Sequence, residues 1–366
     1  MIREEKEIKK GLLNMNKDWT EKNKKMQELV GRGTTFAEGM DVLTDLRNDL
    51  FMQVSYIVNS YPEEAFHQMP FAVADGYHSK TLAYSMWHVF RIEDIVAHTL
   101  INGDEQVLFT GDWQKKIGSP IITTGNELVG EEIAEFSKKL DVKALFEYCK
   151  AVMDSTNMLL GGLSFKDLKR RFSDEDKDRV WAANCVSTDE NAEWLVDYWC
   201  GKDIRGLIKM PFSRHWIMHI EAMCRIKDRL CKMARKGADP IARCGLSCKH
   251  CFLKDWCGGC RTAYNTCSDA MNCPDKICPN TSCCREKGID GCYECDELKE
   301  CSRGFYGYDD IEAVKAMALF IRKHGKKELL KTMDKLHKEY RFDKIQEVLG
   351  NDLKEGFRML EKTYRE

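Results

Sequence analysis

Apolar residues recur at three- and four-residue spacing over long stretches of this chain, a pattern that predicts amphipathic helices. One such stripe consists of Leu43, Leu46, Leu50, Val54 and Ile57. Further long helices are expected at 80–100, 141–160 and 211–234. Four long helices with elaborate connections favour a mainly α fold built on a four-helix bundle.

Weaker patterns fill the stretches between these helices. Residues 3–30 are rich in lysine and predict a polar helix with a solvated face, ending near Gly31. Proline and glycine mark a loop at 61–79, and a second loop is expected at 102–127, with short strands as the alternative. Short helices are expected at 131–139 and 190–201, and a charged connection is expected at 165–180.

The clearest domain boundary is the stretch KGADPIAR, residues 236–243. Two amphipathic helices are expected at 310–325 and 326–340, followed by a shorter one near the C-terminus. We therefore expect four regions, namely a polar helix, a four-helix bundle, a cysteine-rich metal-binding domain, and C-terminal helices packed on that domain, at 1–33, 34–236, 240–304 and 305–366.

Charge and composition exclude several classes of partner. The chain has 57 basic and 59 acidic residues, so no overall field attracts nucleic acid or an anionic membrane. The first ten residues are charged where a secretory signal needs an apolar stretch, and no apolar run has membrane-spanning length. We expect a soluble, cytoplasmic protein.

A pair of histidines interrupts the apolar face of the last long helix. His215 and His219 are four residues apart, about 40° around an ideal helix, and share a face with Phe212, Ala222, Ile226 and Met233. Both imidazoles are therefore expected to point into the core. Glu221 lies about 200° from His219, which makes it a poor ligand; an ion pair with Arg225 is expected instead.

A metal site of the catalytic zinc type needs three protein ligands and an open position. His67 and His78 lie in a predicted loop, and His98 is almost three turns beyond His88 on the same helix. His88 shares its face with Ile92 and Ile95 and can point into the same core. We choose His88 as the third ligand; the alternative is a set of buried histidines that bond to one another or to water.

The stretches TLAYSMWHVFRIEDI and PFSRHWIMHIEAMCRI resemble the DinB-like superfamily of metal-binding four-helix bundles. Those proteins take one histidine from the second helix and two from an H-x-x-x-H on the last, which matches His88, His215 and His219. The resemblance covers about 35–235. It implies a divalent metal (zinc, nickel or iron) and thiol-dependent transfer or isomerisation with low-molecular-weight thiols.

The H-x-x-x-H-x-E form is also similar to the DinB-type domain of iron-dependent ergothioneine sulfoxide synthases, whose larger second domain is not recognisable here. The chemistry implied is Lewis-acid activation of a water or thiol. Arg91, one turn from His88, is a candidate for holding an anionic substrate; the alternative is a carboxylate-paired arginine. Trp87, Phe90 and Trp216 adjoin the ligands, either as pocket walls or as ordinary packing.

Thirteen of the 18 cysteines fall between Cys244 and Cys301. In a reducing cytosol such a cluster indicates metal rather than disulfides, and three C-x-x-C pairs place two thiolates within reach of one ion. Four-thiolate zinc sites and iron–sulfur clusters both fit, and the spacing does not fix which cysteines share a site. The candidate ligands are Cys244, Cys248, Cys251, Cys257, Cys260, Cys273, Cys278, Cys283, Cys292, Cys295 and Cys301.

The segment RCGLSCKHC…CGGC…CCREKGIDGCYEC…C resembles a cysteine-rich bacterial and archaeal family of unknown function, with a match that reaches about Gly325. The resemblance implies bound metal and no particular activity. Residues 244–304 contain 8 basic and 9 acidic side chains, without the basic excess of a nucleic-acid-binding zinc finger.

The leading hypothesis is a cytoplasmic metalloenzyme that uses a three-histidine metal for thiol transfer or hydrolysis on a small molecule. Two alternatives stay open: a non-catalytic metal-binding or redox-sensing protein, and an iron–sulfur module that delivers electrons to a non-haem iron. The expected partner is a small molecule, with a low-molecular-weight thiol as one candidate. Nucleic acid and membrane are excluded, and a homodimer is left open.

Overall fold

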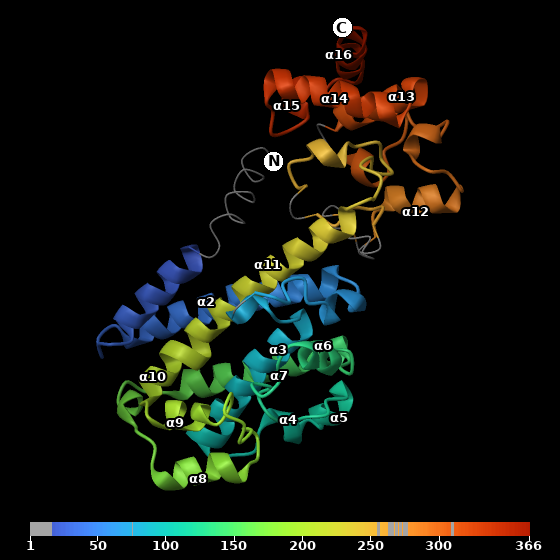
Figure 1. The fold of residues 1–366 in the computed structure, drawn as a ribbon. Coiled ribbons are helices and arrows are strands. Elements are labelled where there is room, and N and C mark those ends of the chain that lie inside the picture. Colours follow the sequence, from blue (N-terminus) through green and yellow to red (C-terminus); the bar gives the residue numbers. More distant parts are fainter. Residues whose placement is uncertain are drawn as a thin grey trace. The chain divides into compact units, whose positions relative to one another are not determined.

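The computed structural model describes residues 17–74, 76–254, 257–262, 267, 270, 273, 277–308 and 311–366. The described chain is mainly helical and contains no strand; two isolated bridges, Arg171 with Asp203 and Ile241 with Ser247, are its β-type pairings (Figure 1). The mainly α prediction is confirmed. The short strands considered for 102–127 are wrong, because that segment forms short helices, α4 (Val107–Thr110) and α5 (Trp113–Ile117).

The chain divides into two compact units, and the boundary between Lys227 and Asp228 lies inside the last long helix of the first unit. The sequence placed the boundary after that helix, at 236–243. In the first unit the long helices are α2 (Phe36–Ser60), α3 (Leu82–Asp94), α7 (Val142–Gly162) and α11 (His215–Arg235). All four lie where the hydrophobic spacing predicts them.

Both histidine-bearing helices adjoin π-helical turns. Helix α3 continues into a π segment at Ile95–Asn102, and α11 follows one at Met210–Arg214. Shorter elements complete the unit: a helix at 17–29, α6 (Glu131–Ser137), α8 (Asp174–Ala182), α9 (Trp194–Cys200) and α10 (Ile204–Lys209). The charged connection expected at 165–180 thus includes the start of α8, where Ser173 and Asp176 form a capping box.

The polar N-terminal helix has a buried side. Over residues 17–29 and the following turn, Trp19, Asn23, Met26 and Val30 are buried, at the three- and four-residue spacing of one helix face. Met26 and Val30 belong to the same hydrophobic core as Leu43 of α2. The lysine-rich side is exposed, as predicted, and the helix is held by this narrow apolar stripe.

A buried charged network fixes α3 against its neighbours. The Arg47 guanidinium, from α2, donates to Glu93 of α3 at 2.9 and 2.7 Å, to Asn157 of α7 at 2.9 Å, and to the Phe212 carbonyl at 3.2 Å. The Trp216 indole on α11 also donates to Glu93, at 2.8 Å. Side chains of all four long helices therefore meet at one fully buried ion pair. Glu93 lies on the same helix as His88, and Trp216 directly follows His215.

The second unit has its own core, formed mostly by α13 (Glu312–His324), α14 (Lys326–Tyr340) and α16 (Leu353–Arg365). Cys244, Cys260, Cys284 and Cys292 pack into that core. The other elements of the unit are short: α12 (Pro279–Glu286), α15 (Gln346–Leu349) and single turns at Cys248–His250, Cys292–Glu294 and Gly304–Gly307.

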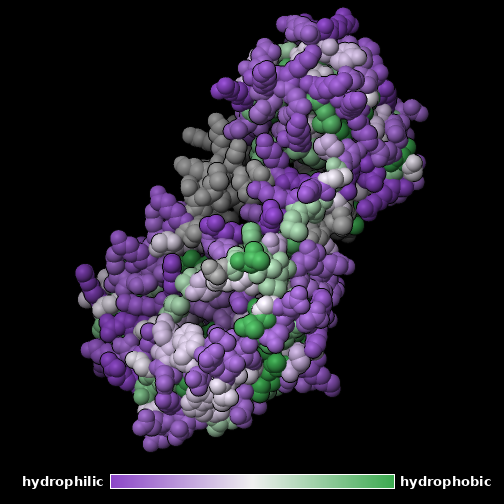
Figure 2. Space-filling view, in the orientation of Figure 1, coloured by the Kyte–Doolittle hydropathy of each residue, from purple (hydrophilic) through white to green (hydrophobic). Residues whose placement is uncertain are grey.

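Within the described residues, no helix is both long and apolar enough to span a bilayer. The face shown in Figure 2 is mostly hydrophilic in both units, with hydrophobic residues scattered singly or in small groups.

Candidate metal centre

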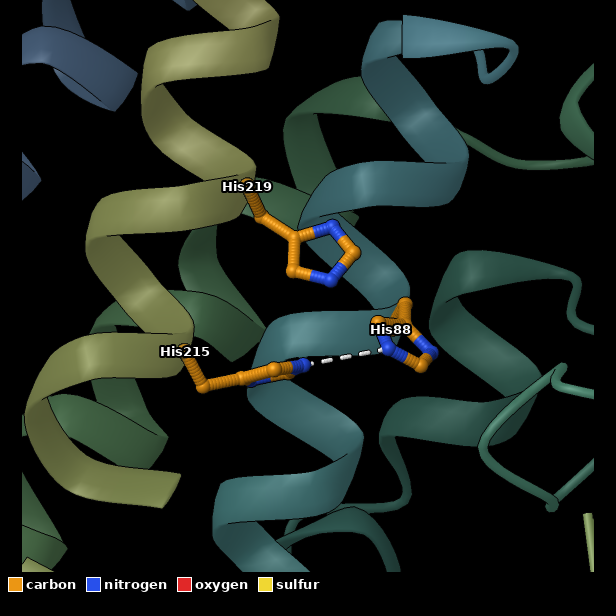
Figure 3. Close-up of side chains that lie close together, drawn as sticks. All are labelled: His88, His215 and His219. Carbon is orange, nitrogen blue, oxygen red and sulfur yellow. Dashed lines mark hydrogen bonds between the residues drawn. The ribbon is translucent and has the colours of Figure 1, made fainter. Parts of the chain in front are cut away.

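His88 lies in the middle of α3, and His215 and His219 lie in the first two turns of α11. Figure 3 shows His215 and His219 projecting from α11 toward His88. One ring nitrogen from each histidine can be chosen so that all three lie within 4.8 Å of one another. The structure therefore brings together the three histidines that the spacing and the resemblance selected.

The closest approach joins two Nε2 atoms. His215 Nε2 and His88 Nε2 are 3.2 Å apart, and the ring centroids of the three histidines are separated by 4.5 to 5.1 Å (Figure 3). Two nitrogens each about 2.0–2.1 Å from a tetrahedral zinc ion lie about 3.3 Å apart. The spacing of the His88 and His215 nitrogens thus matches that of two ligands on one ion.

Burial keeps all three imidazoles neutral. Their side chains are 3 to 7% exposed. Desolvation lowers the pKa of His88 to about 4, and it lowers the pKa values of His215 and His219 well below their ordinary range. Proximity of His88 adds to the effect on His215. Neutral imidazole is the form that binds metal, so the site competes little with protons at neutral pH.

A backbone carbonyl sets the tautomer of His88. Its Nδ1 lies 3.0 Å from the Thr124 carbonyl oxygen, so Nδ1 carries the hydrogen and donates it. The lone pair is then on Nε2, the nitrogen that faces His215. This arrangement, in which the second nitrogen of a histidine donates to a carbonyl, orients ligands in metal sites.

The Thr124 carbonyl is itself held by a row of bonds from α3. Tyr84 donates to the Gly125 carbonyl at 2.9 Å, Trp87 to Thr123 at 3.0 Å and Arg91 to Ile122 at 3.1 Å. Gly125 has a φ of +78°, and a Cβ there would lie 3.1 Å from the Tyr84 ring. The loop 122–125 therefore runs along the face of α3 that carries His88.

Of the two roles considered for Arg91, the structure shows the carboxylate-paired one. Its guanidinium is fully buried and makes five hydrogen bonds: Nε and Nη2 to the Ile122 carbonyl, Nη1 to Asp94 and Tyr148, and Nη2 to Gln106. An arginine has five N–H donors, so none is left for an anionic substrate. The alternative, a carboxylate-paired arginine, is the arrangement present, and Arg91 positions the loop that orients His88.

The other histidines of the first unit lie elsewhere or are already bonded. His98, in the π segment, uses both ring nitrogens, Nδ1 with Asp104 at 2.8 Å and Nε2 with Ser155 at 2.9 Å. His78 lies 3.8 Å from Glu221, and His67 is in a separate turn, Glu63–His67. Glu221 bonds Arg225, so the ion pair expected from the helical spacing is present.

Two residues near the centre were missed by sequence reasoning. The Tyr77 ring meets the His219 ring edge-on at 4.8 Å, and Tyr77 is 41% exposed. The charge of Lys80 contributes to the lowered pKa values of His88 and His219. Tyr77 lies in the predicted loop at 61–79, and Lys80 is the first residue of the helix predicted at 80–100, just before the start of α3 at Leu82. An aromatic residue in a loop next to a histidine-bearing helix was the available signal.

The aromatic residues beside the ligands are packed into the core. Trp87, Phe90 and Trp216 are at most 1% exposed, and the Phe90 and Trp216 rings lie 4.8 Å apart. They form ordinary packing and not the wall of an open pocket. Met233, which the helical face of His215 also predicted as buried, is 47% exposed.

In the second unit the candidate cysteines come from turns and short helices. A tight turn at residues 241–247 carries Cys244, with Ala242 donating to the Leu246 carbonyl at 2.9 Å and Cys248 to Pro240 at 2.8 Å. Gly245, at φ +89°, brings this turn against α13, where a Cβ would lie 2.7 Å from that of Ala318.

Backbone contacts connect this turn to two other cysteines. The Arg243 amide donates to Cys260 Sγ at 3.3 Å, and the Arg243 carbonyl accepts from the Cys292 amide at 2.7 Å. Electrostatic coupling raises the pKa of Cys248 through Cys260, Cys251 and Cys257, after desolvation as the largest cause. These four cysteines, the first two C-x-x-C pairs, are thus near one another.

Cys284 was not among the predicted ligands. It is 1% exposed, and its Sγ lies 3.7 Å from Cys292 Sγ, whereas its neighbour Cys283 is half-buried and bonds Arg303. A bond from Cys284 lowers the pKa of Cys292 to about 7. The remaining predicted ligands are distributed as follows: Cys273 and Cys278 are buried, and Cys251, Cys257, Cys295 and Cys301 are half-buried.

Comparison of the chain with protein-family models, with curated proteins and with solved structures gives no match. The histidine cluster and the cysteine-rich unit could bind metals, and their geometry and chemistry carry the functional argument.

Proposed function

We propose that α2, α3, α7 and α11 form a DinB-like four-helix bundle in which His88, His215 and His219 hold a divalent metal. One observation carries this proposal: three buried, neutral imidazoles from two helices direct nitrogens at a common point. The Nδ1 atoms of His215 and His219 have no hydrogen-bond partner among the described residues. Three buried histidines with so few bonds are costly unless a ligand compensates them.

We propose further that the metal serves catalysis, as thiol transfer or hydrolysis on a small molecule. A divalent metal held by three imidazoles supplies Lewis-acid chemistry, since it lowers the pKa of a water or thiol at a remaining position. Thr124 orients His88, α11 holds the other two rings on one face, and Tyr77 covers His219. A low-molecular-weight thiol is the co-substrate that we would test first.

A specific observation favours the second candidate, a metal-binding or redox-sensing protein. Cys284 and Cys292 place two sulfurs 3.7 Å apart, in a unit that contains 13 cysteines from Cys244 onward. Such a pair suits either a shared ion or reversible oxidation. On this alternative the cysteines are the working groups and the histidine metal is structural.

The metal content of anaerobically purified protein tests the first proposal. His88→Ala and His215→Ala should each remove the same one equivalent of metal and leave the cysteine-bound metal in place. His98→Ala is the matched control, because His98 is 7% exposed like His215 but bonds Asp104 and Ser155. Circular dichroism shows which variants are folded.

Unchanged metal in folded His88→Ala and His215→Ala would refute the site. The catalytic step is tested separately, by conjugation of a small thiol to an electrophilic aromatic compound. We expect activity that depends on added metal and disappears in His215→Ala. Activity that survives removal of the histidine metal would refute catalysis at this site, and a metal-loaded protein without activity would favour the non-catalytic, cysteine-based alternative.

A further inference from the structure

A pocket of about 390 Å³ lies in the second unit, beside two candidate metal ligands, Cys248 and Cys260. Basic side chains dominate its lining. They come from the end of α11 and from the cysteine-bearing turns, and are Lys232, Arg235, Lys236, Lys249, Lys254 and Arg261. Asp239 is the one acidic side chain among the lining residues that the structure describes.

Several of these charges already have partners. Arg261 binds Asp290 at 2.6 Å, and Lys249 binds Asp334. Asp239 pairs with Lys326 at 2.5 Å and with Arg261 of the lining at 3.9 Å. Arg235, Lys236 and Lys254 nevertheless leave the lining with an excess of positive charge, which attracts small anions.

Arg235 adds a donor that no described residue accepts. Its Nε is buried and has no hydrogen-bond partner among the described residues. A buried donor without a partner is unfavourable, and an acceptor oxygen placed in the pocket would satisfy it. Guanidinium groups bind the oxygens of phosphoryl and carboxylate groups in a fixed planar geometry, and lysines add point charges.

We propose that this pocket binds a small phosphoryl-bearing anion, next to the sulfur atoms of Cys248 and Cys260. A multivalent anion suits the lining better than a monocarboxylate, because one negative charge would leave several cations uncompensated. The volume falls within the range of small-molecule sites and suits a ligand no larger than a nucleotide. The site is separate from the histidine cluster, so the proposal is independent of the proposed function.

A competing explanation is that the cations only balance a cysteine–metal site. Four thiolates around one Zn²⁺ leave a net charge of about −2, which nearby cations stabilise. Arg235 and Lys254 both lower the pKa of Cys251, although desolvation, the largest cause, raises it. The two explanations differ in their consequences: only the first gives the metal-loaded protein an affinity for free anions.

Calorimetric titration of the full-length, metal-loaded protein with pyrophosphate, and separately with ADP, tests the proposal at low ionic strength. We expect one anion per chain, with affinity that weakens about tenfold or more in Arg235→Gln/Lys254→Gln. The control Lys362→Gln/Arg365→Gln removes the same formal charge from α16, outside the pocket, and should keep affinity within about twofold. Tighter binding of pyrophosphate indicates an inorganic ligand, and tighter binding of ADP a phosphorylated organic molecule.

Arg235→Gln/Lys254→Gln could weaken binding by releasing cysteine-bound metal, so metal is measured in each variant. Lys236→Gln then decides, because Lys236 lines the pocket and is not among the main causes of the pKa shift of Cys248 or Cys251. We expect several-fold weaker binding with full metal content. The proposal is overturned if neither anion binds at millimolar concentration, if both double variants lose affinity equally, if Lys236→Gln binds normally, or if a short single-stranded oligonucleotide binds more tightly than either anion.

Discussion

The two units position their candidate ligands in opposite ways. In the first, all three histidines stand on long helices, α3 and α11, and a hydrogen bond to the Thr124 carbonyl fixes the orientation of His88. In the second, the cysteines stand in turns, on short helices and in the tight turn around Cys244. The first site is a consequence of helix packing, while in the second the backbone hydrogen bonds around the cysteines are mostly those of short turns.

Because the ligands are positioned differently, we expect a bound metal to have a different role in each unit. The core of the first unit contains large apolar side chains and a buried ion pair. None of these contacts requires a metal ion. Around the cysteines of the second unit, the apolar contribution comes mostly from α13, α14 and α16. We therefore expect metal to fill a formed site in the first unit and to maintain the fold of the cysteine-bearing turns in the second.

Removal of metal should produce the largest contrast between the units. A strong chelator under reducing conditions is expected to expose the amides of 241–254 and 278–301 to hydrogen exchange, because a thiolate–metal site would add stability to turns that contain little regular secondary structure. Amides of α3 and α7 should stay protected. Hydrogen exchange followed by mass spectrometry measures both units in one sample.

The expectation that metal maintains the fold of the second unit alone is wrong if α3 loses protection together with the cysteine-bearing turns. It also fails if the turns keep full protection without metal, because their fold would then depend on α13 and its neighbours alone. Re-addition of zinc after chelation serves as the control for irreversible oxidation of the thiols.

The next largest effect is expected at the buried ion pair of the first unit. Arg47→Met leaves the Glu93 carboxylate buried with only the Trp216 indole as its described side-chain partner. Removal of one partner from such a pair costs about 3–5 kcal/mol. The free energy of unfolding, measured with urea and by tryptophan fluorescence, checks the expectation.

Lys22→Met is the matched control, because Lys22 pairs with Asp49 at the surface, where both side chains are about 40% exposed. A surface pair contributes about 0–1 kcal/mol. Equal losses in the two variants would show that Arg47 does not fix the helices that carry the histidines.

The histidine site could be predicted from the sequence because its geometry follows from helix periodicity. His215 and His219 interrupt an apolar stripe, and His88 lies on an apolar face of another helix, so the inward direction of all three was readable. The full set of contacts made by Arg91 could not be predicted in this way. Asp94 lies one turn along the same helix, but Gln106, Ile122 and Tyr148 come from three other segments, and no local spacing indicates that these three converge on Arg91.

For the cysteines, the sequence predicts the kind of ligand but not which of them lie together. The C-x-x-C pairs predict metal binding, but turns have no period from which to infer which sulfurs meet. The adjacent Cys283 and Cys284 illustrate this limit: Cys284 faces Cys292 and Cys283 does not, because α12 directs them to different sides. The short helices α4 and α5 were missed for a related reason, since elements of four and five residues carry too little periodicity.

Glu221 gives the smallest expected effect and the sharpest check on ligand assignment. It lies two residues beyond His219, and a metal ligand there would make Glu221→Gln lose metal affinity. The structure instead pairs Glu221 with Arg225, whose side chain is 62% exposed. We expect unchanged metal content and a stability loss of about 0.3–0.5 kcal/mol, typical of an exposed i,i+4 pair. His219→Gln, on the same helix, should release the metal. If both variants release it, the ligand set includes Glu221, and the rotation of α11 inferred from helical spacing is incorrect.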